Sequence, residues 1–240
     1  MDYLQVLLLA LLPAAGNFAG GVIAELVPTT RRTLSRALHM AAGIVVAVVG
    51  VELLPEALNG AATWLVMLGF CLGGATFLGL DAALERFGTG NKTAGAWMVY
   101  AAVFIDLFSD GLMIGAGSAV SFSLALVLAI GQVTADVPEG FAAIANFRDK
   151  GLGRGKRLLL AASFAIATVL GASISFWILR DQSESLQLTA LAFTAGLLIL
   201  AAVEEMLKQA HESAEDSRMT AGYFLAGFVL FTLVAGYFET

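Results

Sequence analysis

The sequence has few charged residues and very few residues that bind metals through sulfur or nitrogen. Charged residues make up 13% of the 240 residues, against about 25% in ordinary soluble domains. The single cysteine, Cys71, excludes a disulfide framework and a cysteine zinc site. The only histidines, His39 and His211, lie near predicted helix ends. A Gly-rich phosphate loop, a basic nucleic-acid face and a nucleophile–base arrangement are also missing. We therefore expect neither an enzyme nor a nucleic-acid partner.

Long apolar runs dominate what remains. Hydrophobic residues form 59% of the chain, and the mean hydropathy is +0.85. A transmembrane helix needs roughly 20 apolar residues, which predicts an all-α membrane protein whose residues 1–240 form one transmembrane domain with eight helices. The expected spans are about 4–27, 34–58, 63–86, 93–117, 122–147, 156–179, 186–211 and 220–238. The first is expected to be retained, because Asp2 stands where a signal peptide would carry basic residues.

The basic residues predict the orientation of these spans. Of the 13 Lys and Arg residues, all but Arg180 fall in the loops after the first, third, fifth and seventh spans. Basic loops remain in the cytoplasm, so we expect both termini outside it. The chain should be a multi-pass protein of the cell membrane, plasma or inner, with the lipid bilayer as its surroundings.

A weak internal repeat links the two halves of the chain. Glu52-Leu53-Leu54-Pro55-Glu56-Ala57 in span 34–58 matches Glu205-Met206-Leu207-Lys208-Gln209-Ala210 in span 186–211. Gly69 to Gly74 similarly matches Gly222 to Gly227, and Asp110-Gly111 matches Glu139-Gly140. The matched spans run in opposite directions, which predicts an inverted-repeat bundle with a site near the midplane.

Four acidic residues in spans 93–117 and 122–147 are the main functional signal. Asp106 and Asp110 share one helix face at i and i+4, and Asp136 and Glu139 share another at i and i+3. An ionised carboxylate in hydrocarbon costs several kcal/mol, and no basic residue is near. A bound divalent cation, which prefers several oxygen ligands, is the simplest compensation. Two alternatives stay open: protonated carboxyl groups that bond between helices, and a proton relay.

Other polar residues could assist such a site, and we expect Asp110 and Glu139 to be its first ligands. Pro138 frees a backbone carbonyl near Thr134. Glu52 and Glu205, the matched acids of the repeat, could guide ions or lie at solvated helix ends. The amide of Asn17 in the first span is more typical of contacts between helices. The possible auxiliary residues are Ser109, Gln132, Thr134, Glu52, Glu205 and Asn17.

These motifs resemble the ZIP (Zrt/Irt-like) family of divalent metal transporters. Asp106 to Gly111 resembles the signature His-Asn-x-x-Glu/Asp-Gly, and Ala135 to Gly140 resembles His/Gln-Glu/Asp-Ile-Pro-Glu-Gly. Glu52 to Ala57 resembles His-Leu-Leu-Pro-Glu-Ala. The resemblance implies eight spans with both termini outside, a metal site on the fourth and fifth spans, alternating access, metal flow into the cytoplasm and a homodimer. The metal would be the transported substrate, with no cofactor.

The chain departs from the family pattern at several ligand positions. Asp106 and Ala135 replace the motif histidines, and Thr168 and Val169 stand where relatives with two metals carry Glu and Pro. An all-oxygen site shifts preference from zinc towards manganese, iron(II) or magnesium without excluding zinc. We therefore expect a transporter of zinc, manganese, iron or a similar ion. A non-transporting ZIP-like metal-binding or sensing protein, and a proton-coupled carrier of another solute, are the alternatives.

Overall fold

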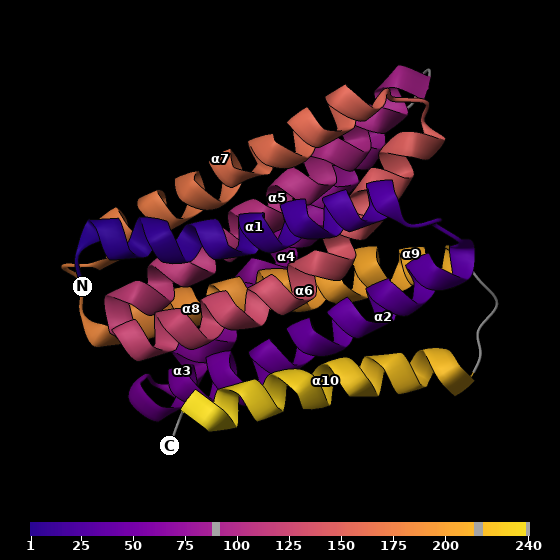
Figure 1. The fold of residues 1–240 in the computed structure, drawn as a ribbon. Coiled ribbons are helices and arrows are strands. Elements are labelled where there is room, and N and C mark those ends of the chain that lie inside the picture. Colours follow the sequence, from indigo (N-terminus) through magenta and orange to yellow (C-terminus); the bar gives the residue numbers. More distant parts are fainter. Residues whose placement is uncertain (88–91, 214–217, 239–240) are drawn as a thin grey trace.

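The computed structural model describes residues 1–87, 92–213 and 218–238, and these residues are almost entirely helical, with no strand among them. Eight helical segments are long and apolar enough to cross a membrane. The predicted all-α membrane fold with eight spans is confirmed. Figure 1 shows N and C at one end of the bundle, opposite the loops that carry most of the basic residues.

The helices follow one another with short connections. In chain order they are α1 Tyr3–Leu26, α2 Arg31–Ala47, η1 Val48–Leu53, α3 Leu54–Gly60, α4 Thr63–Phe87, α5 Lys92–Val120, α6 Phe122–Asp149, α7 Arg154–Leu179, α8 Glu184–Leu200, η2 Ala201–Leu207, α9 Lys208–Ser213 and α10 Arg218–Phe238. Two of these helices start at hydroxyl caps, because Thr30 and Ser121 accept hydrogen bonds from the backbones of Thr33 and Leu124.

Two of the membrane-spanning segments contain a π-helical turn, which the sequence did not predict. Segment Arg31–Gly60 contains η1, and segment Glu184–Glu212 contains η2. Each turn carries one acid of the repeat, Glu52 in η1 and Glu205 in η2. A π turn inserts an extra residue into a helix and is frequent at functional sites. Both turns therefore alter the helix at equivalent points of the two halves.

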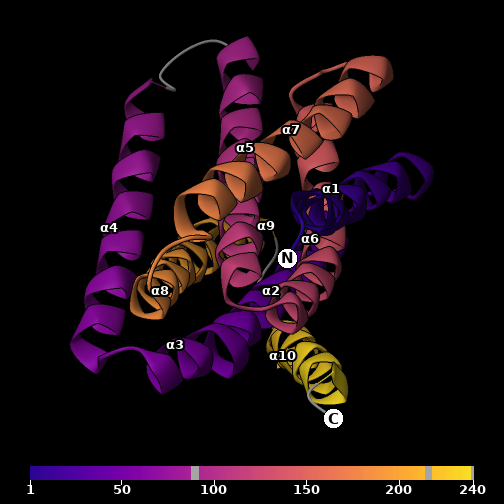
Figure 2. The same cartoon turned by 90° about the vertical axis from the view of Figure 1, so that its left-hand side faces the viewer.

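Helix pairing follows the predicted inverted repeat. The main contacts are α1 with α6, α5 with α7, α4 with α8, and α2 with α10. When each helix is replaced by its counterpart in the other half, the pair of α1 and α6 becomes the pair of α7 and α5. In the same way, the pair of α4 and α8 becomes the pair of α10 and α2. Figure 2 views the molecule from the end that carries N and C in Figure 1, with α4 at the margin and α8 beside it. We group α1, α5, α6 and α7 as the first bundle, and the remaining spans as the second.

Glycines permit the closest of these helix contacts. A methyl group at Gly140 in α6 would overlap the Asn17 carbonyl of α1, and one at Gly111 in α5 would overlap the Thr168 carbonyl of α7. Asn17 and Thr168 thus occupy equivalent positions in the two halves. Small residues let helix backbones approach closely in membranes, so each of the acids Asp110 and Glu139 lies beside a tight helix contact.

An ion cluster joins three helices at the basic-loop end. The Glu25 carboxylate, with its side chain 5% exposed, accepts hydrogen bonds from Arg157 Nε at 2.6 Å and Nη2 at 2.8 Å. Arg148 and Arg154 approach the same carboxylate within 3.8 Å, and Arg148 also donates to the Ala24 carbonyl. The cluster fixes the ends of α1, α6 and α7 relative to one another.

Candidate metal centre

The four acids of α5 and α6 are all buried in the centre of the bundle. Their exposed fractions are 3% for Asp106, 0% for Asp110, 1% for Asp136 and 8% for Glu139. The two helices run side by side as consecutive elements joined at Ser121. Burial of several carboxylates without a basic partner is unfavourable unless protons or a cation compensate them.

Asp106, Asp136 and Glu139 form a compact group, here called the carboxylate triad. One oxygen from each lies within 4.8 Å of the other two. A cation bound at about 2.0–2.6 Å separates its oxygen ligands by up to about 4–5 Å. The triad therefore has the dimensions and the donor atoms of a site for one divalent ion.

Unpartnered oxygen atoms also point to a cation. Among the described residues, the buried atoms Asp106 Oδ1, Asp136 Oδ2 and Glu139 Oε2 have no hydrogen-bond partner. Buried polar atoms in folded proteins are almost always satisfied. A metal ion between the three carboxylates would satisfy these oxygens and balance their charge.

Asp110 lies outside the triad. Its Oδ1 atom accepts a hydrogen bond from Nε2 of Gln132, which lies on α6. The structure therefore brings three of the four predicted ligands together and pairs the fourth with an amide. Asp110 as a first ligand stays a prediction, and the geometry favours Asp106, Asp136 and Glu139.

The predicted auxiliary residues have different surroundings. Ser109 donates to the Ile105 carbonyl at 2.9 Å, and Thr134 donates to the Gly131 carbonyl at 2.6 Å. Both hydroxyl protons are thus engaged by their own helices. Asn17 is fully buried, and its side-chain amide has no hydrogen-bond partner in the described part of the chain. Glu52 is half-buried in η1.

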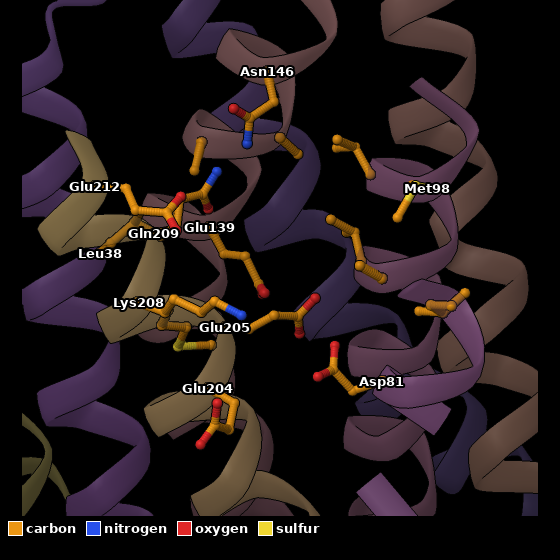
Figure 3. A pocket seen from close by; sticks show the side chains of 17 residues that line it. Leu38, Asp81, Met98, Glu139, Asn146, Glu204, Glu205, Lys208, Gln209 and Glu212 are labelled. Atoms are coloured by element: carbon orange, nitrogen blue, oxygen red, sulfur yellow. The ribbon is translucent and has the colours of Figure 1, made fainter. Parts of the chain in front are cut away.

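A cavity of about 300 Å³ leads from the triad to the basic-loop end of the bundle. Glu139 lines it, and Figure 3 shows the carboxylates of Glu139, Glu205 and Asp81 pointing into one space, with Glu204 pointing away. The end of α4 and α9 complete the wall. Neither Asp81 nor Glu212, both lining residues, was among the predicted site residues. A carboxylate near a helix end carries no sequence signal that separates a cavity wall from solvent.

Comparison with known proteins identifies one family. The model of the ZIP zinc transporter family matches residues 83–235, which include both helices that carry the triad. No curated protein matches the chain.

Proposed function

The chain belongs to the ZIP zinc transporter family, and from this premise we propose that it moves a divalent metal ion into the cytoplasm through the carboxylate triad. Family membership makes it a membrane transporter of divalent metals in general. The observation that carries the finer proposal is the buried triad of Asp106, Asp136 and Glu139, whose member Glu139 lines a cavity together with Asp81 and Glu205.

The shape of the bundle supports an inward-facing state. The cavity reaches Glu139 from the basic-loop end, which the charge distribution predicts to be cytoplasmic. Towards the opposite end, α2, α5, α6, α8 and α10 pack into one apolar core, where Met113, Ile114 and Leu128 are fully buried. In this state a metal ion at the triad exchanges with the cytoplasm and is closed off from the outside.

Alternating access would follow from movement of the two bundles against each other. The triad belongs to the first bundle, whereas Glu205 and Asp81 belong to the second. Tight glycine contacts hold helices together within each bundle, as between α1 and α6 and between α2 and α10. Rocking of one rigid unit against another around a central site is a common transporter mechanism. Glu205 and Asp81 would then receive the ion as it leaves the triad.

The donor set bears on the choice of metal. The triad offers carboxylate oxygens and no nitrogen or sulfur. Hard oxygen ligands suit manganese, iron(II) and magnesium better than nitrogen-rich sites do, and zinc also binds carboxylates. We propose manganese and iron(II) as preferred substrates, with zinc transported as well. The homodimer and the plasma or inner membrane location stay predictions.

Metal uptake into vesicles tests the proposal. Vesicles that contain the purified protein would be offered zinc, manganese, iron(II), cobalt, cadmium and magnesium separately. We expect Glu139→Gln to abolish uptake of every transported metal, because it removes one of three ligands and a compensating charge. Glu204→Gln, on the same cavity but pointing away from it, is the matched control and should retain uptake.

Other outcomes would favour other functions. Binding of a metal by the folded protein without any uptake would replace transport with a sensing role. A flux driven by pH in the absence of metal would indicate a proton-coupled carrier of another solute. Equal metal uptake by wild type and Glu139→Gln would show that the triad is not part of the transport pathway.

A further inference from the structure

A further pocket, here called the α4–α5 crevice, lies on a different face of α5 from the carboxylate triad. It has a volume of about 440 Å³ and is lined by residues of α4, α5 and α8. On α5, Ile105, Phe108 and Leu112 lie at i, i+3 and i+7 and so share one helix face. Asp106 points about 100° away from Ile105 around the same helix. The crevice therefore lies at the depth of the triad but shares no residue with it.

The lining of the crevice offers apolar surface to a ligand. Among the described residues that line it, none is charged, and the two with hydroxyl groups are Thr76 and Ser109. Thr76 donates its hydroxyl proton to the Leu72 carbonyl at 2.8 Å, and Ser109 donates its own to the Ile105 carbonyl at 2.9 Å. Buried water needs about two to four polar partners, whereas apolar cavities stay dry and bind apolar molecules. The crevice therefore suits an apolar ligand.

The crevice separates helices that belong to different bundles. Gly73 of α4 lies against the Phe193 carbonyl of α8, so these two helices of the second bundle form one unit. The contact of α4 with α5 is much smaller than its contact with α8, and Figure 2 shows α4 standing apart from α5. Leu80 and Ile105 line both the crevice and a smaller pocket that reaches Glu205. The crevice therefore lies on the boundary across which the two bundles would move.

The position of the crevice places it against the hydrocarbon of the bilayer. Thr76 and Leu80 on its α4 side are exposed, whereas Ser109 and Leu197, which form its floor, are only 5% and 3% exposed. All its lining residues belong to membrane-spanning segments, and those of α5 lie in the middle of the span Gly95–Val120. The middle of a hydrocarbon core about 30 Å thick is where the acyl chains of the two leaflets end.

We propose that the α4–α5 crevice binds the end of an acyl chain from a membrane lipid, and that this chain stabilises the inward-facing state. An acyl chain is the apolar molecule that the bilayer supplies at this depth, and the apolar lining matches it. The chain fills the space between α4 and α5, so a movement of α5 that closes the crevice has to expel it. The effect on the conformational state rests on the proposed function, whereas the binding of the chain does not.

Photo-crosslinking of the full-length protein in vesicles tests the site. The vesicles would contain a phosphatidylcholine with a diazirine group at the methyl end of one acyl chain, and mass spectrometry would locate the adducts after irradiation. We expect adducts on Ser109 or Leu197, because lipid on the outer surface of the helices does not reach these buried residues. The same lipid with its diazirine beside the ester group should not label them, because that end of the chain lies near the headgroups.

Two tryptophan variants of α4 provide a matched comparison. Thr76→Trp fills the opening of the crevice with an indole ring and should lose the adducts on Ser109 and Leu197. Leu78 is 48% exposed and points to the opposite side of α4, so Leu78→Trp should keep them. Manganese uptake should be slower in Thr76→Trp than in Leu78→Trp, because the ring holds α4 and α5 apart. Equal uptake would overturn the effect on the inward-facing state.

The proposal fails if adducts form only at exposed positions such as Leu78, or if Thr76→Trp leaves the adducts on Ser109 and Leu197 unchanged. A photoreactive phenylalanine analogue in place of Leu80 identifies the occupant directly. Capture of lipid would support the proposal, whereas capture of a second copy of the chain would assign the crevice to a contact between copies and overturn it. Glu139→Gln should keep the adducts, so a failure of the triad as the metal pathway would be distinguishable from a failure of this site.

Discussion

Asp106 is the residue that most directly sets the chemistry of the triad. The ZIP signature resembled by α5 has histidine at this position. We expect Asp106→His to raise the ratio of zinc to manganese uptake by about tenfold, which corresponds to about 1.4 kcal/mol of differential binding. The physical reason is that a nitrogen ligand favours the borderline ion over the harder one. Uptake of both metals in competition measures the ratio.

Asp106→Asn is the control for this change, because it removes the charge without adding nitrogen at ligand distance. It should lower uptake of both metals together. An unchanged zinc-to-manganese ratio in Asp106→His would show that this side chain does not contact the transported ion.

The sequence identified the acids but not their grouping. Spacing placed Asp106 with Asp110 and Asp136 with Glu139, and all four are buried as expected for intramembrane acids. Which three meet depends on the rotation of α5 relative to α6 about their axes. That rotation is set by contacts such as Gly111 with α7 and Gly140 with α1, which a single helix pattern does not contain.

Close packing at glycine is the main constraint on the helices. Gly140 lies against the Asn17 backbone, so the added methyl group of Gly140→Ala would force α1 and α6 apart. Overpacking of this kind costs about 1–3 kcal/mol. We expect a lower melting temperature in detergent, together with weaker uptake because Glu139 is the adjacent residue.

Gly79→Ala is the matched control for that substitution. Gly79 also lies within a membrane-spanning helix, α4, but a methyl group there meets nothing within 4 Å. Alanine has the higher helix propensity by about 0.8–1.0 kcal/mol, so the control should be neutral or more stable. Equal melting temperatures for the two variants would contradict the close α1–α6 contact.

Apolar runs predicted the eight spans, yet they gave no sign of the π turns. In a span that is apolar on every side, hydrophobic periodicity is too weak to register one inserted residue. The turns at Val48–Leu53 and Ala201–Leu207 each contain a repeat acid. The extra residue rotates the side chains that follow it about the helix axis, and so affects where the Glu205 side chain enters the cavity.

At the scale of the whole molecule, the Glu25 cluster holds the first bundle together. Its carboxylate is buried between arginines of α6 and α7. We expect Glu25→Gln to lower the free energy of unfolding by about 1.5–3 kcal/mol, the range for hydrogen bonds to charged groups. Asp181→Asn, which breaks the exposed pair with Arg180, should cost at most about 1 kcal/mol.

Thermal unfolding of the two variants in the same detergent separates these cases. A melting temperature for Glu25→Gln equal to that of Asp181→Asn would show that the cluster does not join the helix ends.

The arrangement of the molecule was predictable only in part. Weak matches such as Asp110-Gly111 with Glu139-Gly140 indicated an inverted repeat, and the helix pairs follow it. The cavity and the contact of His39 with His211 were not predictable. Both depend on how the ends of α2, α4, α5, α6 and α9 meet in space, and those ends carry no shared sequence motif.

The most direct test of the account is to locate the bound metal by anomalous scattering from crystals grown with manganese. We predict one manganese ion at about 2.0–2.6 Å from oxygens of Asp106, Asp136 and Glu139. Manganese bound instead by Asp110 and Gln132, or found only outside the space between α5 and α6, would contradict the carboxylate triad as the transport site.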